Sequence, residues 1–332
     1  MDLLITCKPD YEKLLARELT LYGLKACGEG RGWVRSQAQT EINEACFACT
    51  IRENPVEIEA ASVNAFTEKL IGLFINSIKD KQIDSPWQFL FSSCDDKRLI
   101  GRAKTVENDW RKKIRKKMSR VAKLSSSGIP YSPVFIPGFF VHFIDFNVCL
   151  VSFKALSLGQ KRMQMDPQAP SRSYLKIEEA FNLIGYEPKK NETVVDLGAA
   201  PGGWSYSALR RGAKVIAIDN GRLKEPLESH PNIRHLKEDA LEFDPVGMKP
   251  VDWLFCDIIE RPEVIFNLMH KWLARKWCRN FAVNLKVGRA DPILLLKKIK
   301  DPKKGLSAYC RLLKIRQLYH DRQEITLVGK IA

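Results

Sequence analysis

From residue 173 to the C-terminus, short apolar runs alternate with segments of helical spacing. The runs are TVVDL, KVIAID, IRHLK, VDWLFCD and FAVNLK. The helical segments lie at 173–184, with Ser173 as predicted cap, 203–211, 261–277 and 291–300. Apolar strands joined by helices form a parallel sheet with helices on both faces. The last runs, LLKIRQLYH and EITLVGK, favour an antiparallel hairpin. We therefore predict a doubly wound, Rossmann-like α/β domain that binds ligands at the carboxyl ends of its strands.

The first strand of this domain leads into a glycine-rich turn and a helix, in the stretch VDLGAAPGGWSYSAL at 195–209. A dinucleotide-binding turn usually reads GxGxxG. Here the turn from Gly198 to Gly203 lacks the second glycine of that pattern, and Pro201 stiffens it. No Lys-Ser/Thr pair follows, which excludes a Walker A phosphate loop. The turn admits a ligand close to the backbone but lacks the usual means of holding a pyrophosphate.

Acidic residues follow four successive strands of the predicted sheet. They are Asp196, Asp219, Asp239 and Asp257. Four carboxylates at one sheet edge would repel a polyphosphate. They suit S-adenosyl-L-methionine, whose ribose diol fits Asp219, whose adenine amine fits Asp239, and whose positive charges tolerate the other two. This cofactor is favoured over NAD, which leaves an NAD-linked dehydrogenase as a disfavoured alternative.

Two lysines and two acids lie at neighbouring strand ends of the same domain. Lys176 precedes the first strand, Asp257 and Lys286 end the fourth and fifth, and Glu324 opens the last. This network suits methylation of an alcohol, specifically a ribose 2′-hydroxyl. A lysine accepts the hydroxyl proton when neutral, or stabilises the developing oxyanion when charged, and the acids orient it. No metal ion is required.

Other methyl acceptors call for sequence features that are absent here. Methylases of exocyclic amines carry an Asn/Asp-Pro-Pro-aromatic stretch after the fourth strand, where this chain has CDIIERP. Methylation of pyrimidine carbon 5 needs a nucleophilic cysteine in a Pro-Cys context. Cys256 lies inside an apolar strand instead, and we interpret it as a core residue.

The N-terminal half is predicted to be an α+β region that binds RNA. Predicted strands are LLITC, GWVRSQ, 87–92, 97–104 and a hairpin within 139–156. Predicted helices are DYEKLLARELTLYG, 41–50, 63–79 and a basic helix at 109–124. Cys46 and Cys49 form a lone CxxC without a second pair at zinc-ribbon spacing, so we assign both to a packed helix rather than to a metal site. The domain boundary is predicted within 159–172.

Positive charge points to a polyanionic partner. Lys and Arg number 54 against 39 acidic residues, a net charge of +15. The stretch WRKKIRKKMSRVAKL, residues 110–124, has eight basic residues and no acid. Such a band follows phosphates without reading sequence. The predicted RNA-binding residues are Arg111, Lys112, Lys113, Arg115, Lys116, Lys117, Arg120 and Lys123.

Several features bear on where the protein acts. The N-terminus carries charges where a signal peptide would be apolar, and residues 134–158 are interrupted by polar residues and cannot cross a bilayer. Nine cysteines without a disulfide pattern fit a reducing compartment. We expect a cytoplasmic monomer that binds no membrane.

Five stretches together carry a family resemblance: APSRSYLKIEEAF, VDLGAAPGGWSYSAL, CDIIERP, NLK and RQLYHDRQEIT. They resemble the bacterial large-subunit ribosomal RNA cytidine 2′-O-methyltransferases of type M. The resemblance implies a ferredoxin-like unit at 1–60, a THUMP-like RNA-binding domain at 61–160 and a Rossmann-like methyltransferase domain at 161–332. It also implies as substrate large-subunit ribosomal RNA, free or in an early assembly intermediate.

The same resemblance implies roles for individual residues. Lys176, Asp257, Lys286 and Glu324 match the catalytic tetrad of that group, with Lys286 as the proton acceptor. The cofactor contacts carried over are Ser173, Ala200, Pro201, Gly202, Gly203, Asp219, Asp239 and Asp257. Gly198 and Trp204, which flank the turn, complete the candidate set. The alternative is a non-catalytic RNA-binding or ribosome-assembly factor that retains the methyltransferase fold.

Overall fold

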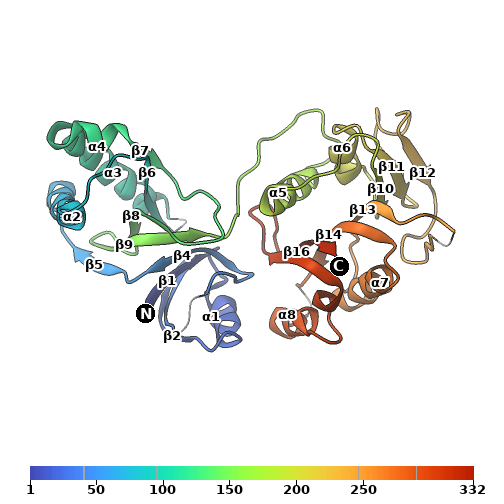
Figure 1. Cartoon of the computed structure of the whole chain (residues 1–332), viewed down its shortest axis with the longest axis horizontal. Helices are drawn as coiled ribbons and strands as arrows, with labels where there is room; N and C mark the ends of the chain where they lie inside the picture. Colours follow the sequence, from blue (N-terminus) through green and yellow to red (C-terminus); the bar gives the residue numbers. More distant parts are fainter. Residues whose placement is uncertain (40–41, 95, 246, 289) are drawn as a thin grey trace. The chain divides into compact units, whose positions relative to one another are not determined.

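The computed structural model describes residues 1–332 except 40–41, 95, 246 and 289. The chain divides into two compact units, residues 1–159 and 160–332. Figure 1 labels the helices and strands of both units, which are described here one at a time.

The N-terminal unit is built on one mixed sheet. Its strands pair in the order β2-β3-β1-β4-β9-β8-β6-β7, and β5 also pairs with β9. The strands are β1 (Asp2–Cys7), β2 (Lys25–Gly30), β3 (Trp33–Gln37), β4 (Ala48–Glu53), β5 (Val56–Glu59), β6 (Trp87–Ser93), β7 (Ser125–Ser127), β8 (Ile136–Phe143) and β9 (Val148–Ser157). Because β4 pairs with β9, residues 1–60 and 61–159 share this sheet. Their assignment to ferredoxin-like and THUMP-like domains stays a prediction.

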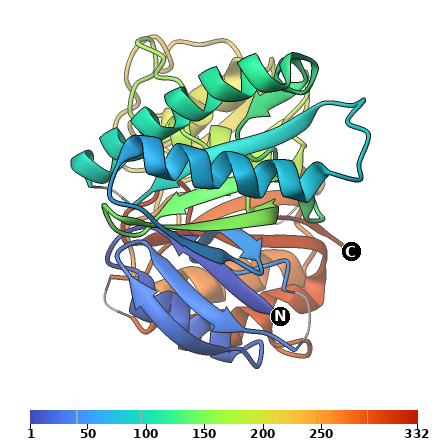
Figure 2. The same ribbon diagram turned by 90° about the vertical axis from the view of Figure 1, so that its left-hand side faces the viewer.

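Helices of the N-terminal unit are α1 (Glu12–Thr20), α2 (Val63–Ile78), α3 (Lys97–Lys117) and α4 (Ser119–Lys123). Figure 2 shows α2 and α3 side by side. Aromatic residues pack between these helices and the sheet, including Phe74, Trp110 and Phe139. This aromatic core holds α3 in place while its opposite side stays exposed.

The helix predicted at 41–50 is wrong. Residues 42–47 contain no helix, β4 begins at Ala48, and residue 41 lies outside the described residues. The backbone N–H groups of Cys46 and Phe47 donate to the buried carboxylate of Glu18, at 2.6 and 3.0 Å, instead of to helical carbonyls. Cys46 is still buried, and Cys49 is partly buried in β4. Among the described residues, no His, Cys, Asp or Glu cluster could hold a metal ion.

The strand predicted at 97–104 is also wrong, because this segment is the first part of α3. Asp96 caps the helix by accepting hydrogen bonds from the N–H groups of Arg98 and Leu99, at 2.7 and 3.2 Å. Buried residues then recur every three or four positions, at Ala103, Val106, Trp110 and Ile114. The basic helix is therefore longer than predicted, and its continuation α4 is offset at Met118, whose backbone is not helical.

The C-terminal unit confirms the predicted Rossmann-like fold. Its sheet order is β12-β11-β10-β13-β14-β16-β15, parallel from β12 to β14 and antiparallel for the last two strands. The strands are β10 (Thr193–Leu197), β11 (Lys214–Ile218), β12 (Ile233–Leu236), β13 (Val251–Cys256), β14 (Cys278–Lys286), β15 (Cys310–Arg316) and β16 (Glu324–Ile331). The carboxyl ends of the parallel strands therefore meet at one edge.

Helices cover both faces of this second sheet. They are α5 (Tyr174–Ile184), α6 (Gly203–Leu209), α7 (Pro262–Ala274), α8 (Pro292–Lys300) and the short 3₁₀ helix η1 (Leu306–Tyr309). Figure 1 shows α5 and α6 on one side and α7 and α8 on the other. Phe181, Trp204 and Phe255 belong to the core beneath α5 and α6.

The segment just before α5 is tied to the C-terminal unit. The backbone N–H of Lys161 donates to Glu179 at 3.0 Å, and that of Met163 donates to His320 at 2.9 Å. The hydroxyl of Tyr206 donates to Asp166 at 2.8 Å. Residues 160–166 are therefore attached to the C-terminal unit by these hydrogen bonds.

Candidate active site

The glycine turn after β10 allows close packing at the mouth of a cavity. Gly198 and Gly202 have φ values of +75° and +111°, a region that residues with a Cβ rarely adopt. A Cβ at Gly198 would lie 2.6 Å from the side chain of Ile258. A Cβ at Gly203 would lie 2.2 Å from the hydroxyl of Ser173. Glycine at these positions therefore lets the turn approach both α5 and the segment after β13.

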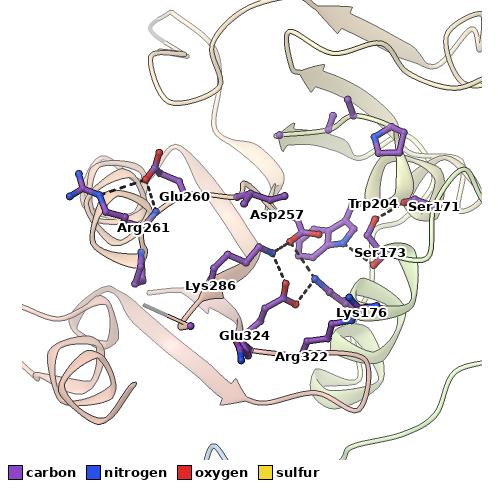
Figure 3. Close-up of a pocket in the computed structure, with 18 residues that line it drawn as sticks. Ser171, Ser173, Lys176, Trp204, Asp257, Glu260, Arg261, Lys286, Arg322 and Glu324 are labelled. Atoms are coloured by element: carbon purple, nitrogen blue, oxygen red, sulfur yellow. Dashed lines mark hydrogen bonds and ion pairs between the residues drawn. The ribbon is translucent and has the colours of Figure 1, made fainter. Parts of the chain in front are cut away.

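A cavity of about 990 Å³ opens beside this turn. It lies where β10, β13 and β14 end and β16 begins, and Figure 3 shows the side chains around it. Its volume is at the upper end of the roughly 300–1,000 Å³ typical of ligand pockets. The cavity therefore has room for a cofactor and part of a second substrate.

The four predicted tetrad residues meet at this cavity. Lys176 comes from α5, Asp257 follows β13, and Lys286 and Glu324 are directly paired across β14 and β16. Figure 3 shows both lysines pointing toward the two carboxylates. The Nζ of Lys176 lies 2.5 Å from Glu324 and 3.6 Å from Asp257. The Nζ of Lys286 contacts Asp257 and lies 3.2 Å from Glu324.

Mutual neutralisation stabilises this cluster in a partly buried place. The four side chains retain only 13–19% of their exposure, and two positive charges offset two negative ones. Burial favours the neutral form of Lys176, but the charges of Asp257 and Glu324 outweigh burial and raise its pKa. Burial likewise opposes ionisation of Glu324, but the two lysines outweigh it and lower its pKa. Both groups are therefore charged at neutral pH, and Lys176 is suited to charge stabilisation rather than to proton acceptance.

The residues predicted to contact the cofactor fall into two groups. Ser173, Gly198, Ala200, Pro201, Trp204 and Asp257 line the cavity. The described lining does not include Gly202, Gly203, Asp219 or Asp239. Asp219 accepts hydrogen bonds from the N–H groups of Ala200 and Gly221, at 2.9 and 2.7 Å, and so supports the turn. Contacts of Asp219 and Asp239 with a ligand stay predictions.

Ser173 does not cap α5 with its side chain, contrary to the sequence prediction. It occupies the cap position, but its own backbone is helical and its hydroxyl shares a 2.7 Å hydrogen bond with Ser171. Its carbonyl accepts a 3.0 Å hydrogen bond from the indole N–H of Trp204. Close packing against Gly203 therefore turns both serine hydroxyls toward the cavity.

Cys256 is a core residue, as the sequence indicated. It is buried in β13, and burial raises the pKa of its thiol to about 12. A thiol in that state is not a nucleophile at neutral pH.

Asp196 is not among the residues that line the cavity, and its side chain lies in the interior of the domain. Its side chain is 1% exposed and accepts a 2.6 Å hydrogen bond from the hydroxyl of Ser205. Burial raises the pKa of Asp196 to about 7 from its ordinary value of 3.8, partly opposed by Ser205. The folded protein thus holds this proton more tightly than the unfolded chain. The resulting stabilisation is full below about pH 4 and is lost as the pH rises through about 7.

We therefore expect Asp196→Asn to gain stability over the wild type as the pH rises. The amide keeps an oxygen for Ser205 but carries no charge, so its stability lacks this pH dependence. The melting temperature of the variant should exceed that of the wild type by a few degrees at pH 8, and the difference should disappear near pH 4. Thermal melts from pH 4 to 8 measure this. Parallel curves for the two proteins would contradict it.

Sequence reasoning missed several residues of the cavity. Ser171, Ile259, Arg261, Arg322 and Gln323 also line it. Ser171 and Gln323 lie within one or two residues of predicted site residues, so proximity in sequence was an available signal. Arg322 comes from the turn between β15 and β16, two residues before Glu324, so the same signal applies to it.

A second candidate surface lies on the exposed side of α3. A groove of about 280 Å³ is lined by Asn108, Arg111, Lys112, Arg115 and Lys116. Lys113 pairs with Glu68 and Asp109, at 2.9 and 3.2 Å, and Arg111 pairs with Glu107 at 3.6 Å. Arg120 pairs with Asp84 at 2.6 Å. The predicted basic residues are therefore present on α3 and α4. Because some of them pair with acidic residues, fewer positive charges are available to a ligand than the sequence suggests.

In a comparison with known protein families, the matching residues lie within the C-terminal unit. Residues 169–290 match the model of the FtsJ-like methyltransferase family. Over these residues the C-terminal unit resembles the FtsJ-like methyltransferases. This match confirms the predicted fold and the predicted cofactor, S-adenosyl-L-methionine.

Curated relatives carry the name ribosomal RNA large subunit methyltransferase M. The protein from Laribacter hongkongensis is 41% identical over 51% of this chain and 50% of its own length. The one from Aggregatibacter aphrophilus is 38% identical over 57% of each chain. In these two the match thus spans about half of the relative. A Marinomonas protein of the same name is 29% identical over 98% of both chains. The resemblance stated from the sequence is confirmed.

A solved structure also matches at full length. The crystal structure of a possible methylase from Clostridium difficile 630 covers 99% of this chain and 97% of its own, at 15% identity. Its TM-score is 0.34.

Proposed function

We propose that this protein transfers a methyl group from S-adenosyl-L-methionine to a ribose 2′-hydroxyl of large-subunit ribosomal RNA, with cytidine as the predicted nucleotide. The observation that carries the proposal is the Lys176, Asp257, Lys286 and Glu324 cluster at the floor of the cavity. The names of the relatives support the RNA substrate, and the FtsJ-like domain supports the methyl donor.

The residues present fit the cofactor. Ser171 and Ser173 offer hydroxyls, the turn at Ala200 and Pro201 offers backbone, and Trp204 offers an apolar surface. Glycine at position 198 lets this turn pack directly against Ile258, where a Cβ would lie only 2.6 Å from the isoleucine side chain. When bound there, S-adenosyl-L-methionine supplies an electrophilic methyl group beside the cluster.

The tetrad activates the acceptor hydroxyl. S-adenosyl-L-methionine held at Ser171, Ser173 and the turn would supply the methyl group to the 2′-oxygen, and the thioether would be its leaving group. The hydroxyl proton passes to the Nζ of Lys286, which Asp257 and Glu324 orient. Lys176 stays charged and stabilises negative charge on the reacting oxygen. The cluster therefore accounts for both the proton and the developing charge without a metal ion.

Labelled methyl transfer tests the proposal. Ribosomal RNA from cells that lack the gene is incubated with the protein and tritiated S-adenosyl-L-methionine, and ribose methylation is then mapped. We expect label at one nucleotide of the large-subunit RNA, and calorimetry should show binding of S-adenosyl-L-methionine but not of NAD. Cofactor binding without labelled RNA would favour a non-catalytic RNA-binding factor instead.

The proposal includes a cellular setting. Cys7, Cys94, Cys149, Cys256 and Cys278 are buried free thiols, which supports a reducing compartment such as the cytoplasm. Among the described residues, no helix is long and apolar enough to cross a membrane. We propose a monomer that acts on free RNA or on an early assembly intermediate.

The exposed side of α3 should contribute affinity for RNA. Replacing Lys112, Arg115 and Lys116 with alanine removes three cations of the groove. We expect RNA affinity to fall about 10- to 100-fold and the slope of log affinity against log salt to flatten by about 2, because fewer counterions are released. Fluorescence anisotropy at salt concentrations between about 50 and 200 mM measures the RNA affinity and its salt dependence.

Lys113→Ala is the matched control for that experiment. Lys113 lies in the same helix but is already paired with Glu68 and Asp109. Its loss should change the salt slope by much less than any of the three groove residues. If the single alanine variants at Lys112, Lys113, Arg115 and Lys116 all flattened the salt slope equally, this result would argue against a defined phosphate path.

A further inference from the structure

A buried polar residue lies directly behind the proposed proton acceptor. Asn284 precedes Lys286 by two residues in β14 and is fully buried among apolar neighbours of the same strand. Its Oδ1 accepts a 2.5 Å hydrogen bond from the Nζ of Lys286. Burying an amide in an apolar strand lowers stability unless its hydrogen bonds are made. The hydrogen-bond partners of Asn284 therefore indicate what this residue does.

Both N–H groups of the Asn284 amide are also used. Its Nδ2 donates to Asp321 at 3.0 Å and to the hydroxyl of Thr326 at 3.1 Å. Thr326 is paired directly with Asn284 across β14 and β16, and its own hydroxyl donates to Asp321 at 3.0 Å. Burial raises the pKa of Asp321 to about 6, so above that pH its carboxylate only accepts hydrogen bonds. The Asn284 amide then has one orientation, with its oxygen toward Lys286.

Asp321 is itself firmly held. It is 3% exposed, and its carboxylate also accepts a 3.0 Å hydrogen bond from the N–H of Leu318. The turn that contains it is anchored to α5, because the N–H groups of Tyr319 and His320 donate to Glu179 at 2.7 and 3.1 Å. The arrangement around Asn284 is thus fixed by three separate segments of the C-terminal unit.

We propose that Asn284, oriented by Asp321 and Thr326, is a positioning residue that sets both the place and the proton affinity of Lys286. This inference rests on the proposed function. A lysine side chain is long and flexible, and an acceptor behind it limits where Nζ lies. Asn284 does this without charge, whereas a third carboxylate would favour the ammonium form and hinder proton acceptance.

The other charged groups around Lys286 act on it from different elements. Asp257 follows β13 and Glu324 opens β16, and both favour its charged form. Lys176 of α5 shares these two carboxylates and reduces their effect. Asn284 is the neutral member of this surrounding shell, so its orientation can be changed while all four charges of the tetrad stay in place.

Asp321→Asn is the sharpest test. The substitution keeps the shape but replaces one acceptor oxygen with a donor, so the Asn284 amide should turn its oxygen toward Asn at 321 and its N–H groups toward Lys286. We expect kcat to fall about 10- to 100-fold, in the range of lost supporting interactions at active sites. The half-maximal rate should move to lower pH, because donors beside Lys286 disfavour its charged form. The KM for S-adenosyl-L-methionine should stay unchanged.

The double variant Asn284→Asp with Asp321→Asn distinguishes a changed amide orientation from a general disruption of the site. It restores complementarity between the two positions but places a carboxylate against Lys286. Its half-maximal rate should therefore move to higher pH, opposite to the single variant. Thr326→Val should lower kcat about 10-fold with Thr326→Ser close to the wild type, which keeps the idea testable if a variant at 321 fails to fold.

Asn280→Asp provides the matched control. Asn280 is a buried asparagine of the same strand, but its amide donates to the backbone of Asp252, away from the cavity. Its pH–rate profile should match the wild type. Wild-type profiles in both the Asp321→Asn variant and the double variant, or equal activity of Thr326→Val and Thr326→Ser, would overturn the inference. If the wild-type protein binds cofactor but methylates no RNA, the proposed function itself fails.

Discussion

Lys286→Ala is expected to lower methyl transfer to ribosomal RNA by about 10³-fold or more, because it removes the proposed acceptor of the hydroxyl proton. Lys286 lies against Asp257 and Glu324 at the cavity floor. The other three members cannot replace it, since Lys176 is held charged by the same two acids. Single-turnover transfer of labelled methyl groups measures the loss without interference from product release.

Cofactor binding should survive that substitution. Ser171, Ser173 and Trp204 are held by hydrogen bonds that do not involve Lys286, and Figure 3 shows these three side chains apart from it. Calorimetry with S-adenosyl-L-methionine should therefore give a dissociation constant within about threefold of the wild type, a change below about 1 kcal/mol. The exposed Lys303→Ala variant is the control for the loss of any one lysine. Wild-type turnover in Lys286→Ala would show that another group takes the proton.

Removal of the N-terminal unit should separate binding of the cofactor from modification of RNA. A chain that begins at residue 160 keeps the cavity and all four tetrad residues. It loses α3 and its exposed cations, which we expect to supply most of the RNA affinity. Methylation at micromolar RNA should fall by at least about 100-fold, while cofactor binding stays close to that of the whole chain.

The point of truncation affects the outcome. Lys161 and Met163 make hydrogen bonds to Glu179 and His320, so a cut after residue 165 removes attachments of the C-terminal unit as well. A chain beginning at 160 should melt at a higher temperature than one beginning at 166. Full methylation by either shortened chain would refute the division of labour between the two units.

Local patterns were sufficient to predict most of the C-terminal unit. Each predicted strand from TVVDL to EITLVGK is present, and the antiparallel final pair follows the parallel strands. Apolar runs of strand length with intervening helices admit few arrangements, and right-handed crossovers bring the strand ends to one edge. Lys176, Asp257, Lys286 and Glu324 are therefore expected at the same edge of the sheet from the sequence alone.

Two elements of the N-terminal unit were wrong because their local patterns were ambiguous. The apolar stretch at 42–50 fits a buried helix as well as a buried strand, and the choice depended on pairing with β1 and on the distant carboxylate of Glu18. Residues 97–104 alternate like a strand, but the cap at Asp96 and the core beneath Trp110 make them helical. Contacts remote in sequence decided both cases.

The sequence by itself determined the Rossmann-like domain, the glycine turn and the basic helix, because each follows from residue periodicity, turn chemistry or charge within short segments. It also placed Lys176, Asp257, Lys286 and Glu324 at the ends of neighbouring strands. Only the tertiary structure decided that Ser173 turns from its helix end toward the cavity, that Lys113 is neutralised, and that Asn284 is locked between Lys286 and Asp321. These contacts join residues that are distant along the chain, and hydrogen-bond partners of that kind are set by strand register and packing rather than by neighbouring residues.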